Sequence, residues 1–487
     1  MIKNNWQIPF FFLLVLISID SFTNDSVLPQ NTQKKEVASY KPYLVMTKFL
    51  LKENLPFSAV TFFKRTLALF PAKADNSELH KVAYELVLQV GSIPFLKVNE
   101  EELLKGGREF SSFILGKKYY EQRNFAKSMD YFNQLKMGEF YYLHALYHLG
   151  TIFLINEKYE DAYLAFQKTA LMAPVLKKKY DAESHTYLSL EFIQESSEIA
   201  IARTFFKMGN LAKARDAFKN ISTQSYFFPE MLYESSWNYY RMGLYEQSVG
   251  KLLTFEAPFM ENYFYPEGEI IKGLTYMKLC RWDDMLDLIK NYRENYKQQA
   301  VSFINFVNNS KEQSKYIQLM IDKDFQKMTH DNFMLRLLKV IQSRPGYISL
   351  SKYFGMISAE KKYIEEKKEK LSKKLYVPIQ KSMKQTTHIL RDFITLYIQK
   401  RIFSLGQEII NLDNVMTEME LFVYSKIKKG IYKKGVNELT VRDKILHLSE
   451  LNRLTGQYYF NFNGEFWADE LGAYLPIMKS KCLLKGK

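Results

Sequence analysis

The chain has 487 residues, of which 47% are hydrophobic and 25% are charged, and its formal net charge is +15. This length exceeds what one compact core usually supports, so two or more structural units are expected. The 13 Pro and 20 Gly are few enough to allow long uninterrupted helices. They disfavour an all-β architecture, which needs more turn residues.

The basic balance indicates mainly a solvated surface. Lys is much commoner than Arg in this chain, whereas Arg is the residue favoured for bidentate contacts to bases and phosphates. We therefore expect no nucleic-acid partner. The alternative would place nucleic acid on the basic helices around Lys361–Lys374, and the export signal described next argues against it.

The N-terminus has the pattern of a secretory signal. Lys3 precedes the apolar run Ile8–Ile19, which is short for a spanning helix and is not followed by the Cys of a lipoprotein signal. We predict a signal peptide over residues 1–23 and a polar linker over residues 24–39. The protein is therefore expected to be exported to the periplasm or the outer membrane. An uncleaved anchor is the alternative, which leaves membrane association open.

The two cysteines of the chain are Cys280 and Cys482. Two residues cannot make the disulfide framework of a small secreted domain. An oxidising compartment would permit one bridge between them, but nothing in the sequence brings them together. We expect two separate thiols.

A pattern of small and aromatic residues recurs along the middle of the chain, with 34 residues between the first and second units and between the third and fourth. A small residue stands in the first half of each unit, at Gly116, Gly150, Ala202, Ser236 and Gly273. A second small residue follows at Ser128, Ala162, Ala214 and Ser248, with Met285 in its place in the fifth unit. Small side chains let two helices of a hairpin approach closely. Because one hairpin cannot bury its apolar face alone, neighbouring hairpins are expected to stack.

These units resemble tetratricopeptide repeats. Residues 149–174 (LGTIFLINEKYEDAYLAFQKTALMAP) show the Leu-Gly, aromatic, Tyr, Ala and Phe pattern of that family, and Pro174 closes the unit. Residues 202–218 are similar, although the leading Trp of the family is absent throughout. The resemblance covers residues 109–300. It implies an α-α superhelix whose concave groove binds other proteins.

Beyond residue 300 the period is lost, but helical patterns continue. Arg344-Pro345-Gly346 marks a break. Ile357, Ile364 and Leu371 then recur every seven residues, which predicts a long helix or a short coiled coil. Pro378 is expected to interrupt it. We favour a helical hairpin packed on its own domain over an intermolecular coiled coil.

We therefore predict an all-α fold, with a superhelical solenoid followed by a helical C-terminal domain. The predicted parts after the linker are divergent helical hairpins (40–108), the repeats (109–300), a helical C-terminal domain with charged long helices (301–455) and an aromatic tail (456–487). Residues 458–476 of the tail (YYFNFNGEFWADELGAYLP) resemble the ending of certain repeat proteins exported by gliding and predatory δ-proteobacteria. That resemblance implies a protein of the cell envelope.

No catalytic signature stands out, because the chain has neither GxxxxGK[ST] nor GxSxG. His144 and His148 are four apart on one helical face but lack the Glu of HExxH, so structural histidines are favoured over a metal site. The adjacent Asp469 and Glu470 suggest a packed or docking element rather than acid–base catalysis. We expect no enzyme activity, no cofactor and no metal.

The resemblance assigns the groove to particular positions of the first helix of each repeat. The matching residues here are Lys117, Tyr120, Tyr147, Arg203, Phe206, Lys207, Tyr233, Trp237, Tyr240, Arg241 and Lys278. Rings and cations suit an extended peptide with acidic and apolar side chains. The alternative is a groove filled by a segment of the same chain.

The expected function is a protein–protein interaction scaffold of the cell envelope that binds a partner in the groove. One alternative is an envelope-associated, peptidoglycan-active enzyme with an α-solenoid. Another is a structural subunit that assembles through the C-terminal helices. The sequence names neither the partner nor the oligomeric state.

Overall fold

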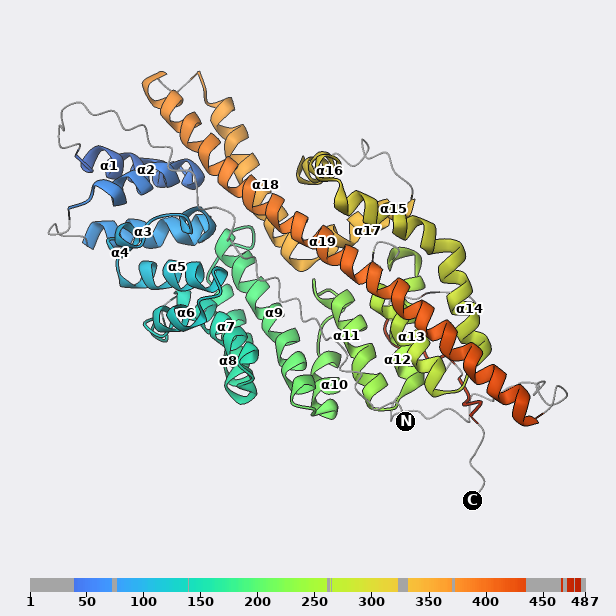
Figure 1. Cartoon of the computed structure of the whole chain (residues 1–487). Coiled ribbons are helices and arrows are strands. Elements are labelled where there is room, and N and C mark those ends of the chain that lie inside the picture. Colours follow the sequence, from blue (N-terminus) through green and yellow to red (C-terminus); the bar gives the residue numbers. More distant parts are fainter. Residues whose placement is uncertain are drawn as a thin grey trace. The chain divides into compact units, whose positions relative to one another are not determined.

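The computed structural model is helical throughout its regular structure (Figure 1). The described residues are 39–71, 77–138, 140–260, 263, 265–322, 332–369, 373–434, 466, 471–476 and 478–482. They contain no β-strand. The expected signal peptide and the linker up to residue 38 lie outside the described residues, as do Asp469 and Glu470 of the tail.

The N-terminal helices are short and follow one another closely. In chain order they are α1 (Lys41–Lys52), α2 (Pro56–Leu69), α3 (Ser77–Val90), η1 (Ile93–Phe95), α4 (Glu100–Leu104), α5 (Arg108–Glu121), α6 (Phe125–Phe132), α7 (Phe140–Ile155), α8 (Tyr159–Lys177), α9 (His185–Lys207) and α10 (Leu211–Lys219).

The second part of the chain continues in the same way and ends in long helices. They are α11 (Phe228–Arg241), α12 (Tyr245–Leu253), η2 (Thr254–Glu256), η3 (Pro258–Met260), α13 (Pro266–Lys278), α14 (Trp282–Tyr292), the π-turn η4 (Arg293–Lys297), α15 (Gln298–Asn308), α16 (Ser310–Asp322), α17 (Asn332–Ser343), α18 (Pro345–Glu366) and α19 (Lys373–Lys434).

The chain divides into two compact units, each made of several stretches of sequence. Unit 1 comprises residues 1–156, 180–187 and 356–396, and unit 2 comprises residues 157–179, 188–355 and 397–487. Within each unit, helices that are neighbours in sequence pack against each other: α1 on α2 and α5 on α6 in unit 1, and α11 on α12 and α13 on α14 in unit 2. This sequential packing is the arrangement of an α-solenoid.

The turns inside the helical hairpins repeat in conformation. Each turn contains a residue with positive φ two positions after the last residue of the first helix, where the left-handed conformation ends a helix. These residues are Asn54, Arg123, Glu157, Gly209, Gly243 and Cys280. Arg123 and Glu157 are 34 residues apart, as are Gly209 and Gly243, so the period found in the sequence is a period of the backbone.

Small residues stand where the helices of a pair cross. A Cβ added to Gly116 of α5 would lie 2.5 Å from the ring of Phe132 in α6. The hydroxyl of Ser128 donates to the carbonyl oxygen of Gly116 at 2.8 Å. Ser236 and Ser248 repeat this contact between α11 and α12, each donating to the other's carbonyl oxygen. The small side chains allow close approach, and the hydroxyls find buried partners.

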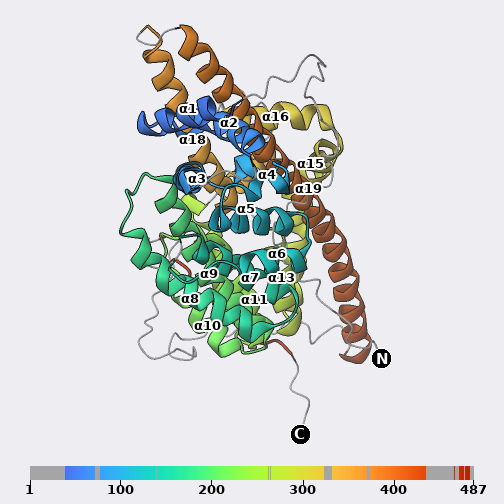
Figure 2. The same ribbon diagram turned by 90° about the vertical axis from the view of Figure 1, so that its left-hand side faces the viewer.

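The C-terminal helices form a hairpin that packs on α2 within unit 1 (Figures 1 and 2). The N-terminus of α2 has no side-chain cap of its own. Glu360 of α18 supplies one, accepting the backbone N–H groups of Phe57 at 2.9 Å and Ser58 at 2.8 Å. Thr386 of α19 donates to the carbonyl oxygen of Phe57 at 3.0 Å. The predicted hairpin is confirmed as a contact within the chain.

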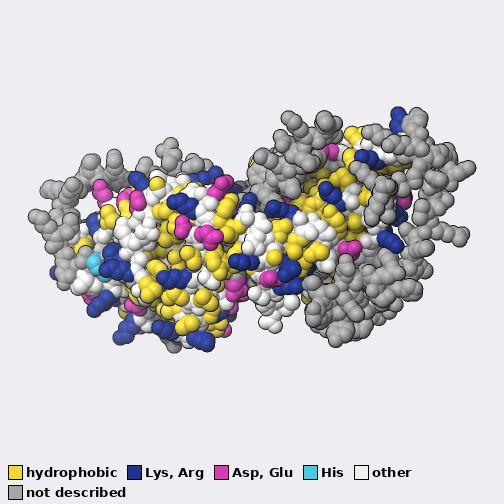
Figure 3. Space-filling model, turned by 90° about the horizontal axis from the view of Figure 1, so that it is seen from below, with side chains coloured by type: hydrophobic (Ala, Val, Ile, Leu, Met, Phe, Trp, Pro, Cys, Tyr) yellow, Lys and Arg dark blue, Asp and Glu magenta, His cyan; other side chains and the backbone are white. Residues whose placement is uncertain are grey.

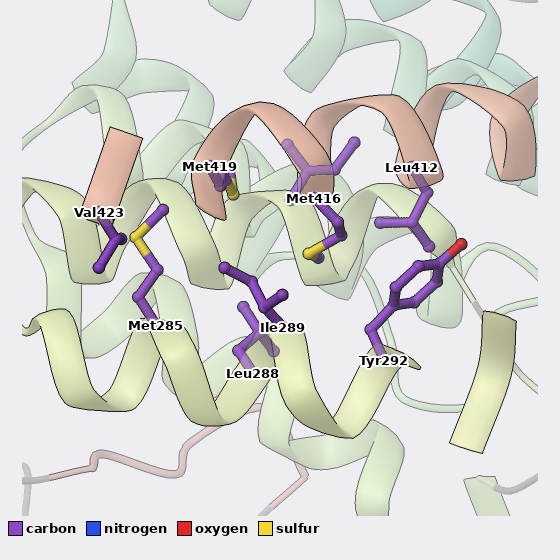
Figure 4. Close-up of a cluster of buried hydrophobic side chains, with 9 residues drawn as sticks. Met285, Leu288, Ile289, Tyr292, Leu412, Met416, Met419 and Val423 are labelled. Atoms are coloured by element: carbon purple, nitrogen blue, oxygen red, sulfur yellow. The ribbon is translucent and has the colours of Figure 1, made fainter. Parts of the chain in front are cut away.

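In unit 2 the C-terminal part of α19 packs along α14 (Figure 4). The buried side chains of this cluster are Ile270, Met285, Leu288, Ile289, Tyr292, Leu412, Met416, Met419 and Val423. Met285 is fully buried here. This explains why the fifth repeat has a large apolar residue where the others have a small one.

Two prolines do not act as the sequence predicted. Pro174 was expected to close a repeat, but α8 continues past it to Lys177. Pro378 was expected to interrupt the helical pattern, but it lies inside α19, which runs for 62 residues. Pro174 lies in the last turn of α8 and Pro378 in the second turn of α19, so the backbone bond that each ring removes is near a helix end rather than in the middle of the helix. The break at Pro345 is confirmed, since α18 begins there.

Cys280 and Cys482 form a disulfide, with their Cα atoms 4.9 Å apart. The expectation of two separate thiols was wrong. The residues are 202 positions apart in sequence, so their meeting depends on the tail folding back to the end of α13. In the chain-entropy account a loop of this length stabilises the folded state by about 5 kcal/mol.

Replacing Gly116 by Ala should destabilise the fold, because the new Cβ would overlap the buried ring of Phe132. Overpacking of this kind costs about 1–3 kcal/mol. Gly355→Ala is the matched control, since Gly355 lies inside α18 and nothing stands within 4 Å of its added Cβ. Urea denaturation followed by circular dichroism should show a loss for the first variant and none for the second. Equal midpoints would contradict the close-approach argument.

Candidate functional site

The residues expected to line the groove fall in both units. Lys117, Tyr120 and Tyr147 belong to unit 1, on α5 and α7. The other eight belong to unit 2, on α9, α11 and α13. The two groups are therefore described separately.

In unit 1 the predicted residues surround buried histidines. Tyr120 is only 7% exposed, and its ring centroid lies 4.7 Å from that of His148. His148 in turn stacks on Phe132 at 5.5 Å. Burial lowers the pKa of Lys117. These contacts place Tyr120, Phe132 and His148 in one packed cluster. Among the described residues, no group of three or more His, Cys, Asp or Glu side chains is placed to hold a metal ion.

His144 lies deeper in the same cluster. Burial, followed by the charge of Lys117, lowers its pKa from 6.5 to about 3. Its ring contacts those of Phe113 and Phe140, with centroids 5.7 and 5.0 Å away. The neutral imidazole therefore behaves as an aromatic core residue at neutral pH.

Unit 2 contains a largely buried network of two arginines and two glutamates, whose side chains are 13–18% exposed. Arg203 of α9 forms bidentate bonds to Glu234 of α11, the shortest 2.7 Å, and a 3.2 Å bond to Glu230. Arg344, which directly precedes α18, donates to Glu230 at 2.7 Å. We call these four residues the Arg–Glu network. It joins two repeat helices to the C-terminal part of the chain.

Aromatic rings extend the Arg–Glu network along α11 and α13. The guanidinium of Arg344 lies 4.7 Å from the ring centroid of Tyr265, which stacks on Tyr233 at 5.0 Å. The Tyr233 hydroxyl bonds to Glu267 and accepts from the indole N–H of Trp237 at 3.3 Å. Stacking and cation–π contacts of this kind add to the burial energy of the rings.

The positive charges of the arginines offset the cost of burying the two glutamates of the network. Burial raises the pKa of Glu230, but Arg344 and Arg203 outweigh it, so the net shift is downward. Burial dominates at Glu234, whose pKa is raised despite Arg203. Because buried ions are costly unless paired, each arginine depends on its glutamate partners.

Part of the expected groove is therefore occupied by the same chain. Arg344 is the residue that joins α17 to α18. Glu230 links it to Arg203, and Tyr265 links it to Tyr233. Trp237 is 3% exposed and Phe206 is 4% exposed, so both contribute to packing in this conformation. At these residues the structure matches the alternative in which a segment of the same chain fills the groove.

Three predicted residues are exposed: Lys207, Arg241 and Lys278. They stand in the last turns of α9, α11 and α13, at the same position of successive repeats. Arg241 lies over the ring of Phe206, with 4.6 Å from its guanidinium carbon to the centroid. We call these three residues the basic row. A cation in the last turn of a helix is also favoured by the helix dipole.

Around the basic row, Tyr240 is half-buried between two rings. Its centroid lies 5.9 Å from Trp237 and 5.8 Å from Tyr245. On the face drawn in Figure 3, basic side chains are interspersed with acidic and hydrophobic ones. The basic row is defined instead by its three cations standing at one repeated position of successive repeats.

The two glutamates of the Arg–Glu network were not predicted from the sequence. Glu230 and Glu234 are four apart on α11, on the face that also carries Trp237. Arg344 was noted only as part of a break. Two glutamates one turn apart on an otherwise apolar helix face were the signal, because such carboxylates need a buried cation.

No protein-family model and no curated protein matches the sequence. Within the described ranges, none of the helices combines the length and the apolar character that a membrane span requires.

Arg344→Ala should lower the free energy of unfolding by about 3 kcal/mol, because it leaves Glu230 buried without one of its arginines. A double-mutant cycle with Glu230→Gln should give a coupling energy of about 1–3 kcal/mol. Lys362→Ala is the control, since its ion pair with Glu366 is exposed. A loss as small as that of the control, measured by urea denaturation, would contradict a buried network.

Acid should destabilise unit 1 through His144. Its folded pKa of about 3 lies below the unfolded value of 6.5, so the unfolded chain binds more protons between these limits. The free energy of unfolding should fall as pH drops below about 6.5, by up to about 1.4 kcal/mol per pH unit. His144→Phe should remove this contribution. Urea denaturation at several pH values from 7 to 5 tests it, and parallel curves for the two proteins would show that His144 does not contribute.

Proposed function

We propose that this protein is an exported scaffold of tetratricopeptide type that binds an acidic segment of a partner protein along the basic row. The observation that carries the proposal is the exposure of Lys207, Arg241 and Lys278 at one repeated position of α9, α11 and α13. The repeat pattern of the sequence and the recurring turn conformation support the family assignment.

The spacing of the basic row suits an extended ligand. Helices packed side by side lie roughly 8–10 Å apart. An extended chain advances roughly 3.3–3.6 Å per residue, so about three residues span that distance. Because three residues make one turn of a polyproline II segment, which is about 9 Å long, an acidic side chain at every third residue of such a segment would place one carboxylate opposite each cation.

Contacts within the protein order the central cation before any ligand binds. Arg241 rests on the ring of Phe206 and donates to the carbonyl oxygen of the same residue at 3.5 Å. An arginine held in this way loses little side-chain freedom when it pairs with a carboxylate. The half-buried ring of Tyr240 offers an apolar contact beside it.

The disulfide supports the expected compartment. Structural disulfides persist in oxidising environments such as the periplasm and are rare in the cytosol. Cys280 and Cys482 are paired in the structure, in agreement with the signal-like N-terminal sequence. We place the scaffold in the periplasm or at the outer membrane.

A second candidate is the structural subunit that assembles through its C-terminal helices. Leu421 and Tyr424 of α19 are 66% and 55% exposed, one turn apart, and such residues could contact another copy. Light scattering of the purified chain and of a Leu421→Ser/Tyr424→Ser variant tests this candidate. The peptidoglycan-active alternative stays a prediction that zymography on cell-wall substrate tests.

Reversal of the basic row, Lys207→Glu/Arg241→Glu/Lys278→Glu, should weaken partner binding. Exposed ion pairs contribute about 0.2–1 kcal/mol each, so three of them predict a loss of roughly threefold to a hundredfold in affinity. Crosslinking in native cells identifies the partner, and calorimetry measures its affinity at two salt concentrations.

The matched control reverses three exposed lysines on other helices of unit 2: Lys290, Lys311 and Lys315. It carries the same change in net charge and should bind the partner almost normally. An equal loss in both triple variants would indicate a general charge effect. Unchanged binding by the basic-row variant would remove this surface from consideration.

A further inference from the structure

After a turn at residues 471–472, the tail crosses α12 without regular secondary structure and is held through its backbone. We call residues 471–476 and 478–482 the strap. The backbone N–H of Gly472 donates to the hydroxyl of Thr254 at 2.9 Å, and the ammonium of Lys251 donates to the carbonyl oxygen of Gly472 at 2.5 Å. At the other end the N–H of Lys481 donates to the carbonyl oxygen of Leu279 at 2.8 Å. These bonds recognise a peptide backbone rather than particular side chains.

Glycines on both sides bring the strap into direct contact with the repeats. A Cβ on Gly250 of α12 would lie 1.7 Å from the carbonyl oxygen of Tyr474. Gly472 has a φ of +77°, and its added Cβ would lie 2.7 Å from a methyl carbon of Leu232. Glycine inside a helix costs about 1 kcal/mol relative to alanine. The close approach of the strap explains why a glycine rather than an alanine is found at position 250.

Apolar side chains complete the contact. Met478 is 7% exposed and packs with Val249 and Leu279. Tyr245, Leu253 and Tyr276 pack around them. Burial, and then the charge of Lys219, lower the pKa of Lys251 to about 8. The covered surface is therefore an apolar strip that also contains a buried cation.

The disulfide fixes one end of the strap to the end of α13. A dithiol could open it by exchange: one thiolate attacks a cysteine sulfur, and the second thiol then displaces the mixed disulfide. The products are two protein thiols and an oxidised dithiol, so two electrons pass to the protein. After that step only the non-covalent contacts hold the strap.

We infer that the surface of α11–α13 centred on Gly250 is a binding site for an extended peptide, that the strap is its resident occupant, and that the Cys280–Cys482 disulfide keeps it occupied. Reduction by a dithiol uncovers the site. The inference uses residues outside the basic row and does not depend on the proposed function.

Hydrogen exchange of the full chain, measured by mass spectrometry with and without dithiothreitol, tests the role of the disulfide. Exchange in residues 471–476 should become at least tenfold faster on reduction, and the variant Cys280→Ser/Cys482→Ser should behave like the reduced protein. Exchange in α5 of unit 1 should stay unchanged. Full protection of the strap after complete reduction would overturn the disulfide's role.

Gly250→Ala tests the site itself in the oxidised protein. Alanine suits the helix but places its Cβ on the strap backbone, so exchange in residues 472–475 should become at least tenfold faster while α12 stays protected. Gly355→Ala should change neither. Unchanged protection of the strap in Gly250→Ala would overturn the assignment of the site.

A non-reducing gel of the purified wild-type protein completes the experiment. An intramolecular strap gives a monomer whose mobility changes on reduction. Disulfide-linked dimers or ladders would mean that the strap binds a second copy, and they would overturn the assignment of the strap to its own chain.

Discussion

Paired helices of this protein approach closely because a glycine or a serine stands where they cross. The ring of Phe132 fills the space left by Gly116. Where α11 and α12 cross, the hydroxyls of Ser236 and Ser248 each donate to the other residue's carbonyl oxygen. A single pair of helices cannot bury all of its apolar surface, so an apolar face remains on each side of the pair. Neighbouring pairs cover some of that surface, and the helices that follow the repeats cover more of it within each unit.

Buried charge attaches those later helices at defined positions. In unit 1 Glu360 caps a helix that carries no cap of its own, and in unit 2 Arg344 completes a cluster with Arg203 and two glutamates. Apolar contacts tolerate sliding by a turn, whereas a misplaced buried ion would stand unpaired at a cost of several kcal/mol. These residues therefore specify the register of the long helices, while the apolar clusters supply most of the stabilisation.

The surfaces of unit 2 differ in what covers them. The Arg–Glu network and its rings are occupied by the chain itself, and the strip under the strap is closed by a covalent bond. The basic row stays exposed at the helix ends, ordered by the contact of Arg241 with Phe206. Under the two proposals made above, unit 2 would present an exposed row of cations and a second, apolar surface whose exposure depends on the redox state.

Local patterns were enough to predict an all-α fold, hairpins with small residues at their crossings and a break at Pro345, because these features depend on residues close in sequence. It could not predict the pairing of Cys280 with Cys482, since a separation of 202 residues carries no distance information. Nor could it tell that Trp237 is buried or that Arg344 completes a network with Glu230. A helical face is the same in sequence whether solvent, a partner or the chain itself covers it. Tertiary structure decides between them, because burial and ion pairing depend on which distant segment arrives there.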